Sequence, residues 1–254
     1  MEKILLLIID AQYDFCNKNG SLFVPGAVED MQHLTSFIKN NANTIDNIVL
    51  SQDAHQVVDI SHPYFWKNKD GKRPEPYTAI SAESVEQGEW IPMTNKDWAV
   101  TYLKELYKQG EFSHVIWPEH CIEGSLGASI VENVMDEVKN WSRLQNKLYT
   151  IIPKGQNPLT EHFGIIRANV PLENDQNTQE NKSLINLLGK YSKICIAGEA
   201  QSHCVANTVK QILKYPDIAS KLVVMKNCMS PVPGFESIAD CIYNQLNPNQ
   251  FIEC

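Results

Sequence analysis

The chain has 254 residues, of which 43% are hydrophobic and 20% are charged, and its formal net charge is −8. This composition is typical of a globular protein and argues against disorder. The acidic charge disfavours nucleic-acid and anionic-membrane partners, which require a basic surface, and no apolar run approaches the ~20 residues of a membrane span. Seven scattered cysteines without a CxxC pair, and a start that lacks a secretory pattern, predict a cytoplasmic protein with reduced thiols.

Short apolar runs mark the expected strands, at residues 4–9, 48–50, 115–117, 148–152, 194–197 and 222–225. They are continuously hydrophobic, which is typical of parallel strands that are covered on both faces. Helical patterns lie between them, at residues 27–41, 125–141, 204–214 and 235–246. We therefore predict one α/β domain spanning residues 1–254. Its core is a doubly wound, mostly parallel sheet of about six strands, flanked by helices in three layers.

The stretch from residue 63 to residue 112 interrupts this alternation. It contains three of the five tryptophans, Trp66, Trp90 and Trp98, together with prolines and many charges. We interpret it as an ordered insertion that covers the strand ends, with a helix near residues 97–109. A surface loop without a role in binding is the alternative. The polar residues 156–182 predict a second long loop.

The chemistry of doubly wound sheets sits at the carboxyl ends of the strands. The residues that directly follow the apolar runs are Asp10, Asp53 with His55, His120, Lys154 and the segment 198–204. They bring together a carboxylate, an ammonium, a thiol and three potential metal ligands. A carboxylate with two imidazoles suits Zn²⁺, Fe²⁺ or Mn²⁺.

Residues 194–208 predict a strand, a tight turn and a helix that begins near Cys204. Unpaired N–H groups at a helix start lower the pKa of a thiol and can hold an oxyanion. Ser202 is the expected N-cap of this helix. A buried thiol without function is an equally good interpretation of this segment taken alone.

Four motifs resemble those of the isochorismatase-like cysteine hydrolases, the superfamily that includes the nicotinamidases. They are Leu-Ile-Ile-Asp-Ala-Gln-Tyr-Asp-Phe at 7–15, Gly-Ser-Leu-x-Val-Pro-Gly-Ala at 20–27, Pro-Lys-Gly at 153–155 and Gly-Glu-Ala-x-x-His-Cys-Val at 198–205. The order of the motifs is that of the family, and they span most of the chain outside the insertion. One departure is Glu199, which occupies a position where the family usually has an aliphatic residue.

The resemblance implies a role for each of these site residues. The implied catalytic triad is Asp10, Lys154 and Cys204. The implied oxyanion hole consists of the backbone N–H groups of Ala200 and Cys204, with a cis peptide bond before Ala200. The implied ligands of a divalent metal, zinc in the first place and iron or manganese otherwise, are Asp53, His55 and His120, with His62 as a fourth ligand. In the family this metal binds the pyridine nitrogen of the substrate.

The expected function is hydrolysis of nicotinamide or a related small amide to its carboxylic acid and ammonia, through a thioester. A small-molecule amide is the expected partner, and assembly into a homo-oligomer is expected from the family. Two alternatives stay open. One is an enzyme of the same fold that acts on a carbamoyl amide or a vinyl ether, and the other is a non-catalytic binding protein. For His62, a structural histidine remains a rival interpretation.

Overall fold

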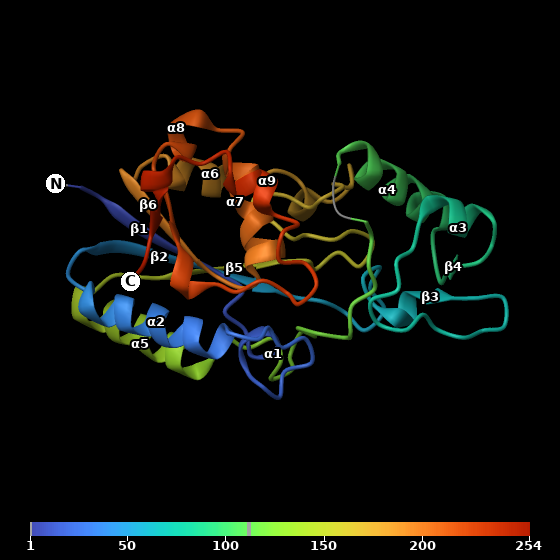
Figure 1. Ribbon diagram of the computed structural model, residues 1–254, viewed down its shortest axis with the longest axis horizontal. Helices are drawn as coiled ribbons and strands as arrows, with labels where there is room; N and C mark the ends of the chain where they lie inside the picture. Colours follow the sequence, from blue (N-terminus) through green and yellow to red (C-terminus); the bar gives the residue numbers. More distant parts are fainter. Residues whose placement is uncertain (1, 111–112) are drawn as a thin grey trace.

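The computed structural model describes residues 2–110 and 113–254, and its centre is a parallel sheet (Figure 1). The strands are β1 (Ile4–Ile9), β2 (Ile45–Asp53), β5 (Thr150–Lys154), β6 (Lys193–Gly198), β7 (Leu222–Met225) and β8 (Phe251–Ile252). Their order in the sheet is β5-β2-β1-β6-β7-β8, so the chain starts in the middle and builds outward to both edges. The predicted doubly wound α/β fold is confirmed.

Helices cover both faces of the sheet, which gives three layers (Figure 1). One face carries α2 (Ala27–Asn40) and α5 (Glu132–Gln145). The other face carries α6 (Lys182–Leu188), α7 (Ala206–Ile212), α8 (Pro216–Ala219) and α9 (Asp240–Tyr243). The short α1 (Tyr13–Cys16) follows β1 directly. None of the helices in the described residues is long and apolar enough to cross a membrane.

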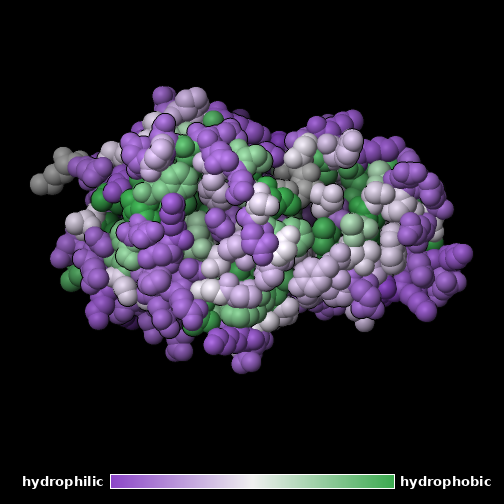
Figure 2. Space-filling view, in the orientation of Figure 1, coloured by the Kyte–Doolittle hydropathy of each residue, from purple (hydrophilic) through white to green (hydrophobic). Residues whose placement is uncertain are grey.

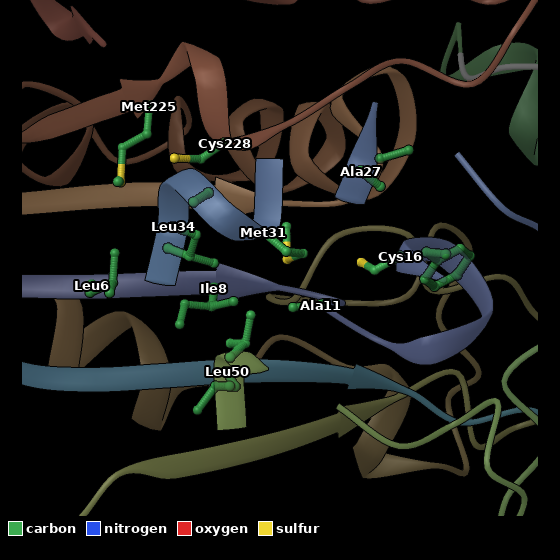
Figure 3. Close-up of a cluster of buried hydrophobic side chains, with 14 of the residues drawn as sticks. Leu6, Ile8, Ala11, Cys16, Ala27, Met31, Leu34, Leu50, Met225 and Cys228 are labelled. Atoms are coloured by element: carbon green, nitrogen blue, oxygen red, sulfur yellow. The ribbon is translucent and has the colours of Figure 1, made fainter. Parts of the chain in front are cut away.

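Strand β1 supplies apolar side chains to both layers. Leu6 and Ile8 pack with Leu34 of α2 on one face (Figure 3), whereas Leu5 and Leu7 pack on the other. All five side chains are fully buried. Because successive side chains of a strand point to opposite faces, burial on both faces requires the uninterrupted apolar run seen in the sequence.

The insertion forms a small lobe beyond the carboxyl ends of the strands (Figure 1). Its elements are a 3₁₀ turn (Pro63–Phe65), β3 (Trp66–Lys67), α3 (Ala82–Glu86), β4 (Ile91–Pro92) and α4 (Lys96–Lys108). Trp66 and Tyr102 lie in its own apolar core. The indole Nε1 of Trp98 donates to Leu159 O at 2.8 Å, which ties the lobe to the loop after β5. The predicted helix is present as α4, and residues 111 and 112 lie outside the described residues.

The surface of this body and lobe is mostly hydrophilic on the face shown in Figure 2. Hydrophobic side chains on that face form small separate patches rather than one continuous area. Scattered apolar residues of this kind are normal for a protein surface.

The predicted strand at residues 115–117 is wrong. Val115 forms an isolated bridge with Ala79 of the insertion, and Ile116 is buried in the core of the lobe. Val115 and Trp117 pack with the core of the body, so the run is apolar because it lies between two cores, and it does not join the main sheet. The strand that completes the sheet is β8, which the apolar pattern missed because it has only two residues.

Three predicted helices differ from those observed. Helix α5 begins at Glu132 because the residues before it bond to the segment after β1, as in Tyr13 N to Ser129 O at 2.9 Å. Within 235–246 only α9 is α-helical. The helix expected at 204–214 starts as a π-helical turn (Gln201–Val205) and continues as α7. Ser202 does not cap it, because its hydroxyl accepts from Val232 N instead.

We expect Gly198→Ala to lower the free energy of unfolding by about 2 kcal/mol or more. Gly198 has φ +116°, and a Cβ added there would lie 1.9 Å from Ile9 O in the neighbouring strand. The matched control is Gly189→Ala, since Gly189 has φ −58° and its added Cβ meets nothing closer than 3.6 Å. Urea unfolding measures both variants. Equal midpoints for the two would contradict the close packing of β6 against β1.

Candidate active site

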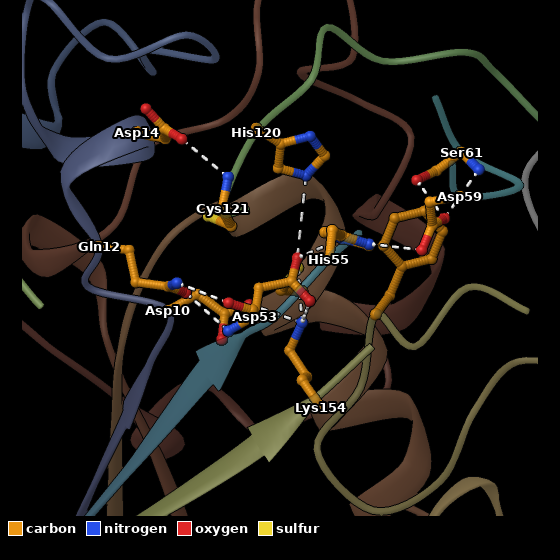
Figure 4. Close-up of polar contacts among 12 residues, drawn as sticks. Asp10, Gln12, Asp14, Asp53, His55, Asp59, Ser61, His120, Cys121 and Lys154 are labelled. Atoms are coloured by element: carbon orange, nitrogen blue, oxygen red, sulfur yellow. Dashed lines mark hydrogen bonds and ion pairs between the residues drawn. The ribbon is translucent and has the colours of Figure 1, made fainter. Parts of the chain in front are cut away.

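Three charged side chains meet where β1, β2 and β5 end (Figure 4). Lys154 Nζ lies 2.8 Å from Asp10 Oδ2 and 3.0 Å from Asp53 Oδ1. The parallel register pairs Asp53 with Lys154, and Asp10 follows the last residue of β1. All three residues are at most 5% exposed. The strand pairing therefore places one ammonium between two carboxylates in a site closed to water.

The ionisation of this cluster follows from its burial. Burial alone would lower the pKa of Lys154, but the charges of Asp10 and Asp53 raise that pKa well above its usual value. Burial raises the pKa of Asp10 against the opposing effect of Lys154. Burial would also raise the pKa of Asp53, yet His55 and Lys154 hold it well below its usual range. Lys154 and Asp53 thus form a stable charged pair, and Asp10 is the carboxylate that accepts a proton more readily.

Cys204 lies in the π-helical turn and faces the same cluster. Its Sγ is 3.7 Å from Lys154 Nζ, and the residue is 5% exposed. The turn follows a cis peptide bond between Glu199 and Ala200, and Ala200 O accepts from the backbone N–H groups of His203 and Val205. Ala200 and Cys204 therefore lie in one tight turn, although their role as an oxyanion hole stays a prediction.

The ionisation of Cys204 differs from the sequence-based expectation of a lowered pKa. Burial raises the pKa of this thiol well above its ordinary value, although Lys154 opposes the effect. A hydrogen bond to Asp10 and the charge of that carboxylate raise the pKa further. The helix start and the single ammonium do not compensate for the loss of water. Cys204 is therefore a neutral thiol whose proton lies next to a carboxylate.

Asp53 also belongs to a cluster of potential metal ligands. Ligand atoms of Asp53, His55 and His120 all lie within 4.8 Å of one another. His55 Nε2 is 3.1 Å and His120 Nε2 is 3.8 Å from Asp53 Oδ2 (Figure 4). Two ligands at ~2.0–2.1 Å from a tetrahedral ion are about 3.3 Å apart, so these separations fit a divalent metal. A carboxylate with two imidazoles is also a suitable donor set.

Hydrogen bonds fix the direction of both imidazoles. His55 Nδ1 is 3.1 Å from Asp59 Oδ2, and His120 Nδ1 is 2.9 Å from Pro118 O. Such partners of the second ring nitrogen orient metal-binding histidines in many proteins. His62 lies beside the cluster, but its Nε2 faces His120 Nδ1 at 3.2 Å and its Nδ1 faces a backbone oxygen. Its role as a fourth ligand stays a prediction.

Two residues that support the carboxylates were not identified from the sequence. The Ser51 hydroxyl donates to Asp10 Oδ1 at 2.5 Å. The Gln12 side chain donates to Asp53 O at 2.8 Å and accepts from Asp53 N at 2.7 Å. The available signals were the polar Ser51 inside a buried strand and the polar Gln12 three residues after the end of β1. Neither signal says which carboxylate the side chain contacts.

A narrow cavity lies between the lobe and the body and reaches His203, the residue before Cys204. Its walls include Tyr102 and His114 from the lobe, and Trp117, Glu161 and His203 from the body. The rings of Trp117 and His203 are in edge contact, with centroids 5.1 Å apart. Burial raises the pKa of Glu161 to about 8. The cavity therefore has aromatic walls and one buried acid.

Comparisons with known proteins agree with the fold described above. No family model matches the chain. The chain is 23% identical over 241 residues to the nicotinamidase of Saccharomyces cerevisiae, covering 95% of this chain and 94% of that protein. The crystal structure of the yeast nicotinamidase with the inhibitor nicotinaldehyde superposes with a TM-score of 0.66 at 19% identity, over 99% of this chain and 100% of that one. The pyrazinamidase of Pyrococcus horikoshii in complex with zinc gives a TM-score of 0.58 at 15% identity, over 99% of both chains. The predicted resemblance to the nicotinamidase-like branch is confirmed.

We expect His120→Ala to lower the metal content of the purified protein, because it removes one of three converging ligand atoms. The measurement is elemental analysis of divalent metals per chain, before and after dialysis against a chelator. His33→Ala is the control, since His33 is exposed and bonds to Asn227 O far from the cluster. Equal metal content in the wild type and His120→Ala would contradict the ligand set.

Proposed function

Because the chain has the isochorismatase-like fold of the nicotinamidases, we propose that it is a metal-containing cysteine amidohydrolase. It converts nicotinamide or a related small amide to the carboxylic acid and ammonia. One observation carries the proposal. Cys204 Sγ is 3.7 Å from Lys154 Nζ, which in turn is 2.8 Å from Asp10 Oδ2, in a buried site. A thiol, a base and a cation in mutual contact are the requirements for nucleophilic attack on an amide.

The first step forms the bond between sulfur and the amide carbon. Because the Cys204 thiol is neutral and bonds to Asp10, the carboxylate takes the proton as the sulfur attacks. The Lys154 ammonium stabilises the negative charge that develops on the sulfur. Lys154 keeps its own proton throughout, since two carboxylates hold its pKa well above neutrality.

The second step expels ammonia. The carbonyl oxygen becomes an oxyanion, which the N–H groups of Ala200 and Cys204 stabilise by donating hydrogen bonds. Asp10 returns its proton to the amide nitrogen as the carbon–nitrogen bond breaks, leaving a thioester on Cys204. Asp10 then takes a proton from the attacking water and returns it to the sulfur as the carbon–sulfur bond breaks, which releases the carboxylic acid and the free thiol.

A heteroaryl ring is the part of the substrate that the remaining residues suit. Asp53, His55 and His120 would hold a divalent metal, with zinc supported by the donor set and by the similar zinc-bound pyrazinamidase. When bound, the ion supplies a Lewis acid for the ring nitrogen. The Phe15 ring is in edge contact with His120 at 5.4 Å between centroids. Trp117, against His203, provides a second aromatic surface on the cysteine side.

The three metal-ligand residues favour a nicotinamide-like amide over the alternative substrates. A carbamoyl amide or a vinyl ether has no ring nitrogen for a metal held by these residues to bind. We expect the enzyme to act in the cytoplasm, where its seven free cysteines stay reduced. Its assembly into a homo-oligomer remains an expectation from the family.

We expect Cys204→Ala to abolish ammonia release from nicotinamide, with a loss of about 10³-fold or more in kcat. The assay uses metal-replete protein and couples released ammonia to an optical readout. Cys241→Ala is the matched control, since Cys241 is an exposed free thiol. Substantial turnover by Cys204→Ala, with intact thermal unfolding, would contradict the nucleophile. Wild-type protein that leaves nicotinamide and a panel of related heteroaryl amides intact would contradict the proposed function.

We expect Ser51→Ala to lower kcat by about tenfold while KM and metal content stay nearly unchanged. The substitution removes the hydroxyl that holds Asp10 Oδ1, so the base loses its fixed direction. Steady-state kinetics and elemental analysis provide the two readouts. Loss of the metal in this variant would show that Ser51 supports the whole cluster instead of Asp10 alone.

A further inference from the structure

Glu199 is a buried acid that the proposed reaction does not use. It is 0% exposed and directly precedes the cis peptide bond of the nucleophile turn. Its Oε2 accepts from Ser230 N at 3.1 Å. Within the described residues, no N–H or hydroxyl group donates to its Oε1, which is buried. The neighbour that shares a hydrogen bond with Glu199 is the carboxyl group of Asp30, in α2.

Two carboxyl groups can share a hydrogen bond only when one of them is protonated. Burial raises the pKa of Glu199 well above its usual value, and the charge of Asp30 raises it further. The bond from Glu199 lowers the pKa of Asp30, which burial raises. Glu199 is therefore the donor and Asp30 the acceptor.

Glu199 and Asp30 hold the turn that carries Cys204 through the same residue, Ser230. Asp30 Oδ2 accepts from the Ser230 hydroxyl at 2.5 Å, and Ser230 O accepts from Gln201 N at 2.8 Å. Glu199 N donates to Ile9 O at 2.9 Å. Ala200 thus lies between two residues, 199 and 201, that are both held through Ser230. Gly26 leaves room for this contact, since a Cβ there would lie 2.3 Å from the Ser230 hydroxyl oxygen.

We propose that Glu199 and Asp30 share one proton, and that this pair, through Ser230, positions the turn that carries Ala200 and Cys204. Neither residue touches the substrate, so both are positioning residues. The proposal rests on the proposed function for its effect on catalysis, but the shared proton itself does not. It also gives a physical role to the buried Glu199.

The surroundings of the pair make a second negative charge costly. Several titratable groups act on Glu199 or Asp30 from the elements packed against them. They are Cys16 of α1, Glu29 and His33 of α2, Cys228 of the 3₁₀ turn after β7 (Lys226–Cys228), and Tyr243 of α9. His33 is the basic residue of this set, and it is exposed and bonds to Asn227 O. Ionised Glu199 would thus place two buried carboxylates together without a buried cation beside them.

The first experiment follows stability against pH and does not depend on catalysis. Because the pKa of Glu199 is raised in the folded state, its proton stabilises the fold most at low pH. That contribution is lost as pH rises from the ordinary glutamate pKa towards the raised one. We expect Glu199→Gln, whose amide N–H₂ can donate to Asp30, to show a flatter dependence of the unfolding free energy on pH. The control is Glu89→Gln, an exposed glutamate in the lobe. A slope equal to that of the wild type in Glu199→Gln would overturn the shared proton.

The second experiment measures catalysis. We expect Glu199→Gln to keep kcat within about twofold at neutral pH and to move the alkaline decline of kcat to higher pH. Glu199→Leu has no donor for Asp30 and should lower kcat about tenfold, with KM and metal content nearly unchanged. Wild-type kcat and pH profile in Glu199→Leu would overturn the positioning role. If the wild type hydrolyses no amide, the proposed function fails, and the stability experiment still decides whether the proton is shared.

Discussion

The buried Lys154 ammonium is the interaction on which the site depends. Removing a cation from water costs several kcal/mol, and that cost is recovered only when geometry and hydrogen bonding are complete. Asp10 and Asp53 supply the two counter-charges at 2.8 and 3.0 Å. Because these residues end three different strands, the ion pairs form only if β1, β2 and β5 end at the same height. The register of the sheet therefore decides whether the charged groups of the site can meet.

Asp53 links the two parts of this site through its two oxygens. Oδ1 contacts Lys154 on the cysteine side, and Oδ2 faces His55 and His120 on the metal side. A shift of this one carboxylate would disturb the cation and the ligand cluster together. The Gln12 side chain prevents such a shift by bonding to both backbone groups of Asp53. The site is thus built on rigid strand ends, which hold catalytic groups more accurately than free loops do.

The sequence was sufficient to predict the sheet, the two helical layers and the residues at the strand ends, because apolar runs and their boundaries are local patterns. Prediction from the sequence failed where the apolar pattern of a segment depends on which distant part of the chain covers it. In residues 115–117, Ile116 enters the lobe core whereas Val115 and Trp117 pack with the core of the body, and a run of three apolar residues does not reveal that it joins no sheet. The residues that hold the site in place could not be identified from the sequence either. Ser51 contacts a distant segment, as does Glu199 in its pair with Asp30, and no local spacing encodes those contacts.

Loss of hydration explains why the Cys204 thiol holds its proton. Burial raises the pKa of the thiol more than Lys154 lowers it, and the charges of Asp10 and Asp53 act in the same direction as burial. Both acids next to this turn, Cys204 and Glu199, are therefore held neutral by the same loss of hydration. Their protons have different fates. In the proposed reaction the proton of Cys204 passes to Asp10 when the sulfur attacks, whereas the proton that we propose on Glu199 stays in place and holds the turn of Ala200 and Cys204.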